Sequence, residues 1–309
     1  MSAWRVIDCS ATSGALRSAR GQLVVEAEGQ TQPVPVPIQE VSVLLVGPRM
    51  RFSTGSMHRA LEAGVAVLFT DWRGVPEGGA YGWSTHTRVG ARQLAQASVS
   101  LPRRKNAWGR IVRAKVLGQA QNLSERAPQV AQRLADLAQQ VRSGDPSNVE
   151  AQAARLYWAA LFDEPFIREP RGGEGWNSCL DYGYGVLRGF GIRAVLAAGL
   201  LPGLGIFHRG RSNAFNLVDD LLEPYRPAID DAVVQMPSES CVDDSAVKRE
   251  LVAAATQRFE ADGTGIGASI LGLAQQLGRY YEGDIARLTV PHWRGPKDQG
   301  AERGEDPEW

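Results

Sequence analysis

Residues 207–227, FHRGRSNAFNLVDDLLEPYRP, are polar where a buried core segment would be apolar. A histidine is followed by two arginines, then by two adjacent acids, a third acid and Pro-Tyr-Arg-Pro. Two interpretations are open. The stretch is either a solvated turn and helix face, or a site that holds a metal ion and handles phosphate groups.

The acids of this stretch have the spacing of a shared cation site. Asp220 and Glu223 are three residues apart, which places both carboxylates on one face of a helix. Pro224 follows directly, and a proline inside a helix removes a backbone hydrogen bond and kinks the helix. Together with His208 these groups offer oxygen and imidazole donors, which suit Mg²⁺ or Mn²⁺. The alternative is an acidic face exposed to solvent.

Glu150 is a third acidic candidate, at the start of a predicted helix over residues 148–162. Ser147 precedes it by three residues, the spacing of a capping box, in which the glutamate reaches back to the cap's own N–H. Glu150 also shares a helix face with apolar residues that follow it, and an acid on a buried face needs a partner or a metal. On spacing alone, capping is the stronger interpretation.

The composition describes a folded protein without a general basic character. The chain has 309 residues, of which 43% are apolar and 22% charged, enough for two domains. The 34 basic residues balance the 34 acidic ones, which is unlike a typical nucleic-acid-binding domain. All cations except four lysines are arginines, whose planar fork grips phosphate, although a GC-rich genome would also favour arginine.

The cysteine pattern and the apolar runs indicate the cellular compartment of the protein. The three cysteines, at positions 9, 179 and 241, have no metal-binding spacing and fit a reducing cytoplasm. The longest apolar run, residues 192–207, is broken by glycine and proline and is too short to cross a bilayer. We therefore expect a soluble, cytoplasmic protein without membrane contact.

The hydrophobic pattern changes along the chain and predicts the α+β class. Residues 1–88 carry short runs rich in valine and isoleucine, separated by turn residues, and predict a small β domain. Residues 89–290 carry apolar residues at helical spacing and predict a larger all-α catalytic domain. Residues 291–309 are polar and rich in glycine and proline, so we expect a disordered tail.

A second polar stretch, GWNSCLDYGYGVLRG at residues 175–189, places several candidate contacts on one helix. Tyrosines among apolar neighbours usually belong to the core. In a nuclease they could also stack on bases or bond a phosphate.

Five segments, in this order, resemble a known family. They are the β-part segments VPIQEVSVLLVG and LEAGVAVLFTD, the helix from Glu150 to RLYWAALF, the stretch NSCLDYGYGVLRG, and GLLPGLGIFHRGRSNAFNLVDDLLEPYRP. The last is similar to the family's Gly-Leu-x-Pro-x-x-Gly-x-x-His run with its Asp-Leu-x-Glu-Pro-Phe-Arg-Pro ending. The family is the CRISPR-associated endonuclease and integrase of spacer acquisition, the first of the Cas proteins. The short β domain is more like the variety found beside Cas9-type systems.

The resemblance implies a metal centre in a DNA-joining enzyme. It implies Glu150, His208 and Glu223 as ligands of Mg²⁺ or Mn²⁺, with Asp220 behind them or joining the ion. Two positions depart conservatively from the family pattern, with Asp181 in place of asparagine and Tyr225 in place of phenylalanine. The resemblance further implies a homodimer, two of which flank a small dimer of the second Cas protein.

The expected reaction is attack of the 3′-hydroxyl of a protospacer DNA fragment on a phosphodiester of the CRISPR repeat. The candidate DNA contacts are Asn177, Tyr182, Arg188, Arg209, Arg211 and Arg226. Because the net charge is zero, a basic surface is expected elsewhere, around LPRRKNAWGRIVRAK at residues 101–115. Two rival functions stay open: an ordinary metal-dependent nuclease or phosphodiesterase that uses water, and a non-catalytic DNA-binding scaffold.

Overall fold

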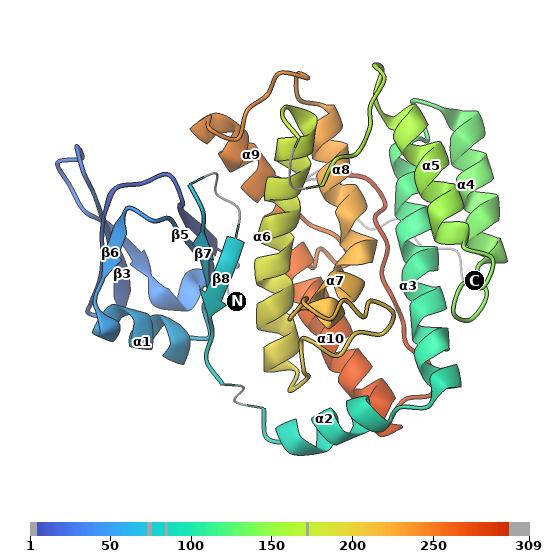
Figure 1. Cartoon of the computed structure of the whole chain (residues 1–309), viewed down its shortest axis with the longest axis horizontal. Coiled ribbons are helices and arrows are strands. Elements are labelled where there is room, and N and C mark those ends of the chain that lie inside the picture. Colours follow the sequence, from blue (N-terminus) through green and yellow to red (C-terminus); the bar gives the residue numbers. More distant parts are fainter. Residues whose placement is uncertain (1–4, 73–75, 84–85, 171–172, 297–309) are drawn as a thin grey trace.

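The computed structural model describes residues 5–72, 76–83, 86–170 and 173–296. Two β-sheets form its N-terminal part and helices form its C-terminal part, so the predicted α+β class is confirmed (Figure 1). The last strand ends at Ala80 and the first helix of the second part begins at Val89, close to the change predicted near residue 88. The division of the chain into two separate domains stays a prediction.

The first sheet lies between the second sheet and the helices (Figure 1). Its strand order is β1 (Arg5–Cys9), β5 (Val41–Val46), β7 (Ala66–Thr70) and β8 (Pro76–Ala80). The first three run parallel and β8 is antiparallel to β7. Every residue of β5 is buried, as its unbroken sequence VSVLLV indicates for a strand covered on both faces.

The second sheet and one helix cover the outer face of the first sheet. Its order is β4 (Val34–Pro37), β3 (Gln22–Ala27), β2 (Gly14–Ala19) and β6 (Met50–Phe52). β4 lies at the edge, as its alternating prolines predict, because proline cannot donate to a neighbouring strand. Helix α1 (Thr54–Glu62) follows β6.

Helix α6 (Trp176–Ala197) connects the sheets to the remaining helices (Figure 1). Glycines on two of its faces allow this close packing. A Cβ at Gly189 would lie 2.7 Å from Val43 of β5, and a Cβ at Gly191 would lie 2.7 Å from Val218. The inner face of the first sheet and the helices therefore share one hydrophobic core.

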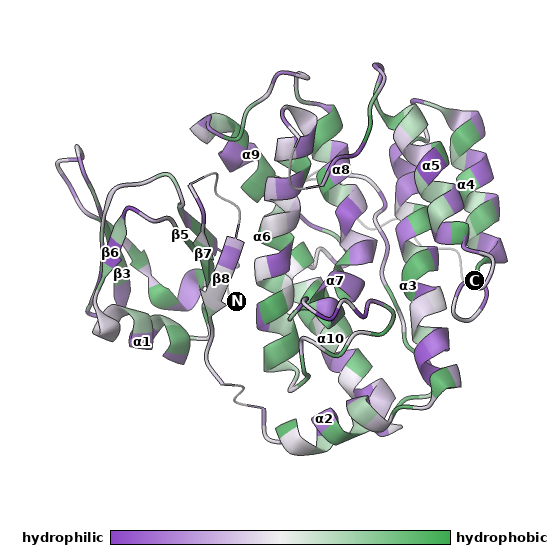
Figure 2. Ribbon diagram, viewed as in Figure 1, coloured by the Kyte–Doolittle hydropathy of each residue, from purple (hydrophilic) through white to green (hydrophobic). Residues whose placement is uncertain are grey.

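The other long helices surround α6 or extend the bundle away from it. They are α2 (Val89–Ser98), α3 (Leu101–Asn122), α4 (Pro128–Gln140), α5 (Val149–Leu161), α9 (Ser245–Thr256) and α10 (Ile266–Glu282). The predicted helical region begins with two helices, α2 and α3, and Pro102 lies in the first turn of α3. Hydrophobic and hydrophilic residues alternate around α4 and α5, as expected of helices with one buried face (Figure 2).

The kink predicted at Pro224 is confirmed. The chain passes from α7 (Asn216–Leu222) through a single 3₁₀ turn, η2 (Glu223–Tyr225), into α8 (Arg226–Val234). The tighter turn contains Pro224 and is packed against α3. The proline thus turns Glu223 toward α3.

The expectation of a disordered tail from residue 291 is wrong for residues 291–296. Trp293 is fully buried and its ring stacks on Phe259 with a centroid distance of 5.9 Å. Burying a large aromatic side chain stabilises the segment that carries it. Residues 297–309 lie outside the described part of the chain.

All three cysteines are free thiols, buried at positions 9 and 179 and exposed at 241. Burial raises the pKa of the Cys9 thiol to about 12 and that of Cys179 to about 11, so both stay protonated near neutral pH. In the described residues, no helix has the length and apolar character needed to cross a membrane.

Candidate active site

A large cleft of about 1390 Å³ lies between the first sheet and the helices. Leu45, Trp72 and Pro76 line it from the sheet side. Its charged lining on the helical side includes Lys115, Arg168, Asp181, Arg188, His208, Asp219, Glu223, Arg226 and Asp230. The cleft therefore contains His208 and Glu223 of the predicted ligands, among both cationic and acidic side chains.

Glu150 does not belong to a capping box, so that interpretation is wrong. The Asp145 carboxylate accepts the backbone N–H groups of Val149, at 2.8 Å, and of Glu150, at 3.0 Å. Asn148 precedes the helix in a left-handed conformation with φ 51°, which lets the chain turn back onto Asp145. Because Asp145 satisfies the first N–H groups, the Glu150 side chain is free to point elsewhere.

This arrangement predicts which residue stabilises the start of α5. Asp145→Ala should lower the free energy of unfolding by about 1 kcal/mol, because two N–H groups lose their acceptor. Ser147→Ala, at the position expected to cap the helix, should leave the free energy of unfolding nearly unchanged. Denaturant unfolding of the two variants measures the difference, and a larger loss for Ser147→Ala would contradict the assignment.

The Glu150 carboxylate binds Lys115 of α3. The Lys115 Nζ lies 2.7 Å from Glu150 Oε1 and 2.6 Å from Glu223 Oε2. The contact with Glu223 is an ion pair without hydrogen-bond alignment, which leaves the buried Oε2 without an aligned donor. One lysine therefore joins two predicted ligands that lie 73 residues apart in the sequence.

Glu223 is held between two cations. Its Oε1 accepts from the Arg226 Nε at 3.0 Å, while Lys115 faces the other oxygen. Burial alone would raise the pKa of Glu223, but the charges of Arg226 and Lys115 outweigh it and lower the pKa to about 2. Glu223 is therefore a carboxylate at every physiological pH.

His208 is oriented by a buried acid. The carboxylate of Asp220 is fully buried and accepts the backbone N–H groups of Phe207, at 3.0 Å, and His208, at 3.2 Å. His208 Nδ1 lies 2.7 Å from Asp220 Oδ1. Because a carboxylate only accepts hydrogen bonds, Nδ1 carries the proton and Nε2 is left as the donor atom for a ligand.

The pair is electrostatically coupled. The hydrogen bond to Asp220 raises the pKa of His208 above its usual value, and the charges of Glu223 and Glu150 add to this. Burial raises the pKa of Asp220, while its hydrogen bonds oppose the shift. Asp220 thus contacts the Nδ1 side of the His208 ring and positions the ring.

The donor chemistry of these residues fits a hard divalent ion, but Lys115 stands within the set. Two carboxylates and an imidazole with a fixed tautomer are suitable ligands for Mg²⁺ or Mn²⁺. In the described residues, no group of three or more His, Cys, Asp or Glu side chains is arranged to hold a metal ion. An ion shared by Glu150 and Glu223 has to take the place of the Lys115 ammonium.

Several of the predicted DNA contacts are already engaged within the protein. Asn177 accepts from Arg168 at 2.9 Å and donates to the Ile167 carbonyl at 2.9 Å. The Tyr182 ring is buried and its hydroxyl donates to Asp8 at 2.6 Å. Both side chains hold structural segments together, and their role as DNA contacts stays a prediction.

The four arginines predicted to contact DNA differ in whether they form ion pairs within the protein. Arg188 pairs with Asp219 at 3.1 Å, and Arg226 pairs with Glu223 and lies over the Tyr184 ring at 4.5 Å from its centroid. Both still line the cleft. Arg209 and Arg211 are exposed and stay candidates for phosphate contact.

The basic surface expected over residues 101–115 is partly used for packing. Arg103 donates to the carbonyls of Tyr280, at 2.7 Å, and Ile285, at 2.6 Å. Lys115 is buried among acids, while Lys105 and Arg113 are exposed. The segment therefore offers fewer free cations than its sequence indicates.

Sequence reasoning missed a buried network beneath the cleft. Asp230 accepts from the hydroxyls of Tyr157, at 2.9 Å, and Tyr184. Burial raises the pKa of Asp230 to about 6, although the two tyrosine hydrogen bonds oppose this. Lys115 was also missed, and the only signal for it was that the chain has so few lysines.

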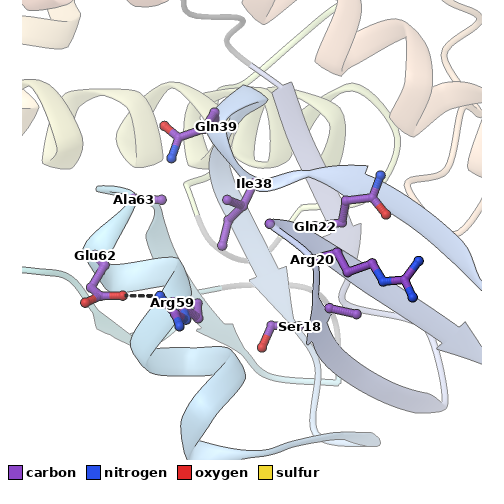
Figure 3. Close-up of a pocket in the computed structure, with 10 residues that line it drawn as sticks. Ser18, Arg20, Gln22, Ile38, Gln39, Arg59, Glu62 and Ala63 are labelled. Carbon is purple, nitrogen blue, oxygen red and sulfur yellow. Dashed lines mark hydrogen bonds and ion pairs between the residues drawn. The ribbon is translucent and has the colours of Figure 1, made fainter.

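A second hollow of about 500 Å³ lies in the β-sheet part, beside α1 and the turn between β2 and β3 (Figure 3). Arg20, Gln22 and Gln39 line it, and Arg59 pairs with Glu62 at 3.3 Å. Of the residues described around it, Glu62 alone is acidic and none is a histidine. It does not offer the ligands of a metal centre.

Comparison with known proteins identifies the family. A sequence model of the family described as "CRISPR associated protein Cas1" matches residues 10–254. The chain belongs to the Cas1 family. The family resemblance predicted from the sequence is therefore confirmed.

Two curated Cas1 relatives match most of the chain. A CRISPR-associated endonuclease Cas1 from Neisseria meningitidis serogroup C is 38% identical over 225 residues, covering 72% of this chain and 73% of the relative. A second, from Pyrobaculum aerophilum, is 29% identical over 277 residues, covering 82% and 92%. Both carry the name endonuclease.

Solved structures share the Cas1 fold. A casposase bound to integration product superposes with a TM-score of 0.75 at 18% identity, over 94% of each chain. A Cas1 protein from Thermotoga maritima gives 0.71 at 16% identity, over 90% of this chain and 97% of the other. A chain of a Cas6-RT-Cas1–Cas2 complex gives 0.75 at 17% identity, over 96% of this chain and 36% of the other.

Proposed function

We propose that this Cas1 protein is a metal-dependent DNA integrase that joins a protospacer fragment to the CRISPR repeat. The observation that carries the proposal is the joining of Glu150 and Glu223 by Lys115, with the Asp220-oriented His208 lining the same cleft as Glu223. Family membership and the likeness to a casposase bound to integration product support it.

In the proposed reaction, a 3′-hydroxyl oxygen of the fragment attacks a phosphorus of the repeat backbone. The new P–O bond forms as the repeat's own P–O3′ bond breaks, so one phosphodiester replaces another and no water is consumed. The proton of the attacking hydroxyl is transferred, in net terms, to the departing 3′ oxygen. Attack and departure both place negative charge on oxygens at phosphorus, which the cleft must stabilise.

Each part of the site has a task in this scheme. Glu150, His208 and Glu223 would hold a Mg²⁺ or Mn²⁺ ion, which supplies a Lewis acid for the phosphoryl oxygens. Asp220 keeps the His208 proton on Nδ1, so that Nε2 would be available to the ion as a neutral ligand. Arg188 and Arg226 line the cleft where the DNA backbone would pass, and neither reads sequence.

We also propose that the protein acts as a homodimer, paired with a small dimer of a second adaptation protein. The support is its likeness to a chain of a Cas6-RT-Cas1–Cas2 complex. Size measurement of the purified chain, alone and mixed with that second protein, tests this proposal.

The experiment that tests the function supplies the protein with a DNA fragment bearing free 3′ ends, a repeat target and Mn²⁺. An integrase gives a strand that carries both fragment and repeat sequence and releases the upstream part of the repeat strand with a 3′-hydroxyl, and a fragment with 3′-dideoxy ends gives no such strand. An ordinary nuclease gives only shortened strands, equally from both fragments. A scaffold binds both DNAs and changes neither.

The exposed arginines beside His208 should contribute to the salt dependence of DNA binding. For Arg209→Ala combined with Arg211→Ala, the slope of log K against log salt should flatten by about 0.9 for each lost duplex phosphate contact. Arg17→Ala combined with Arg20→Ala, exposed on the distant second sheet, is the matched control and should leave the slope unchanged. Fluorescence titrations at several salt concentrations measure it, and an equal slope in both double variants would refute the placement.

A further inference from the structure

Lys115 joins the two carboxylates proposed as metal ligands, although these come from different elements. Its Nζ lies 2.7 Å from Glu150 of α5 and 2.6 Å from Glu223 of η2. The three side chains are only 15%, 22% and 6% exposed, respectively. A single ammonium therefore stands where a cation shared by both carboxylates would stand.

The lysine is suited to a reversible contact. Its helix is fixed, because Trp108, Ile111 and Val112 of α3 are buried in the core. Its ammonium is a compact charge on a flexible four-carbon stem, unlike the planar fork of arginine that this chain uses almost everywhere else. The side chain also lines the cleft, so the ammonium can reach it without a change in the backbone.

Charge makes the ammonium and a divalent ion competitors. Glu150 and Glu223 carry two negative charges, which Lys115 and Arg226 already balance. A divalent ion bound to the same oxygens would stand directly beside the ammonium, and like charges at such distances in a partly buried site repel strongly. The arginine bonds a different oxygen of Glu223, so the lysine is the group that has to move.

We propose that Lys115 is a positioning residue, a tethered cation that holds Glu150 and Glu223 together in the metal-free protein and gives up its place to the incoming ion. This inference rests on the proposed function and deepens it. After displacement, the ammonium remains on the wall of the cleft, where the ligand it suits is a phosphate oxygen of the DNA. Folding of the site thus does not depend on metal, whereas loading of the site requires one local exchange of cations.

The test is a Mn²⁺ titration of metal-free, DNA-free protein, followed by electron paramagnetic resonance of the unbound ion. Lys115→Met and Lys115→Gln should each bind Mn²⁺ at least about tenfold more tightly than the wild type, equivalent to ~1.4 kcal/mol. Lys105→Met, which removes an exposed lysine of the same helix, should bind like the wild type.

Thermal unfolding supplies a second readout that does not involve activity. In chelator, Lys115→Met should unfold at a lower temperature than the wild type, because Glu150 loses its ion-pair partner and Glu223 keeps only Arg226. Saturating Mn²⁺ should then raise its Tm by more than it raises that of the wild type. Lys115→Gln keeps a hydrogen-bond donor at the position and serves if the methionine variant does not fold.

The possible outcomes distinguish a failure of this inference from a failure of the proposed integrase function. Unchanged or weaker Mn²⁺ binding in both Lys115 variants, with a wild type that joins DNA, overturns the inference alone. A wild type that neither binds Mn²⁺ nor joins DNA overturns the proposed function as well. Tighter binding in both variants, with Lys105→Met unaffected, supports the exchange of cations.

Discussion

Glu223→Gln is expected to lower the rate of strand joining about 10³-fold, because a metal ligand that stabilises the reacting phosphate contributes several kcal/mol. The amide keeps the size of the side chain but is neutral, so it cannot supply an anionic oxygen to the ion. It also removes the charge that Lys115 and Arg226 now share. The measurement is the initial rate of joined product in the presence of Mn²⁺.

Glu282→Gln is the matched control for that loss. Glu282 is an equally buried acid, 6% exposed, that also faces two cations, Arg88 and Arg92, but it lies at the end of α10 outside the cleft lining. Its replacement should cost stability and leave the joining rate within a few-fold of the wild type. A comparable loss of activity in both variants would show that Glu223 acts through folding alone.

Asp220→Asn is expected to lower the joining rate about 10–100-fold, the usual effect of losing a partner that orients a metal-bound histidine. An asparagine amide can donate to His208 Nδ1, which would move the ring proton to Nε2 and block the atom that faces the ion. The hydrogen bond to Asp220 also raises the pKa of His208, so the variant should have a lower pKa.

The raised pKa of His208 determines how the joining rate should depend on pH. The wild type should lose activity as the pH falls through the raised pKa of His208, because the protonated ring cannot bind a metal. In Asp220→Asn, that acidic limb should move to lower pH. Asp219→Asn, an adjacent acid that pairs with Arg188 instead, should keep the limb of the wild type. Identical pH–rate profiles for Asp220→Asn and wild type would contradict the role of Asp220.

Patterns local to the sequence predicted most of the fold. The unbroken apolar run of β5, the alternating prolines of β4 and the proline at position 224 each indicate a structure that the backbone itself requires. The candidate site residues on the final motif were predicted from local spacing as well. Asp220 and His208, which pair in the structure, are only 12 residues apart in the sequence.

Contacts between distant segments could not be predicted in this way. The spacing of Ser147 and Glu150 favoured a capping box, but Asp145 satisfies the helix start once Asn148 turns back. Lys115 and Asp230 belong to the site through packing of α3 and α8 against other helices, which no local pattern encodes. The burial of Trp293 could not be predicted for the same reason, because the residues around it in the sequence are polar and its ring packs against a distant segment.

Anomalous X-ray scattering from crystals grown with Mn²⁺ tests the central claim most directly, because it locates the ion itself. We expect one strong peak per chain, within about 2.0–2.3 Å of a Glu150 oxygen, a Glu223 oxygen and the Nε2 of His208. In that crystal the Lys115 ammonium should no longer lie between the two carboxylates. A saturating concentration of Mn²⁺ that leaves no peak among these side chains, with Lys115 still bridging the glutamates, would contradict the account.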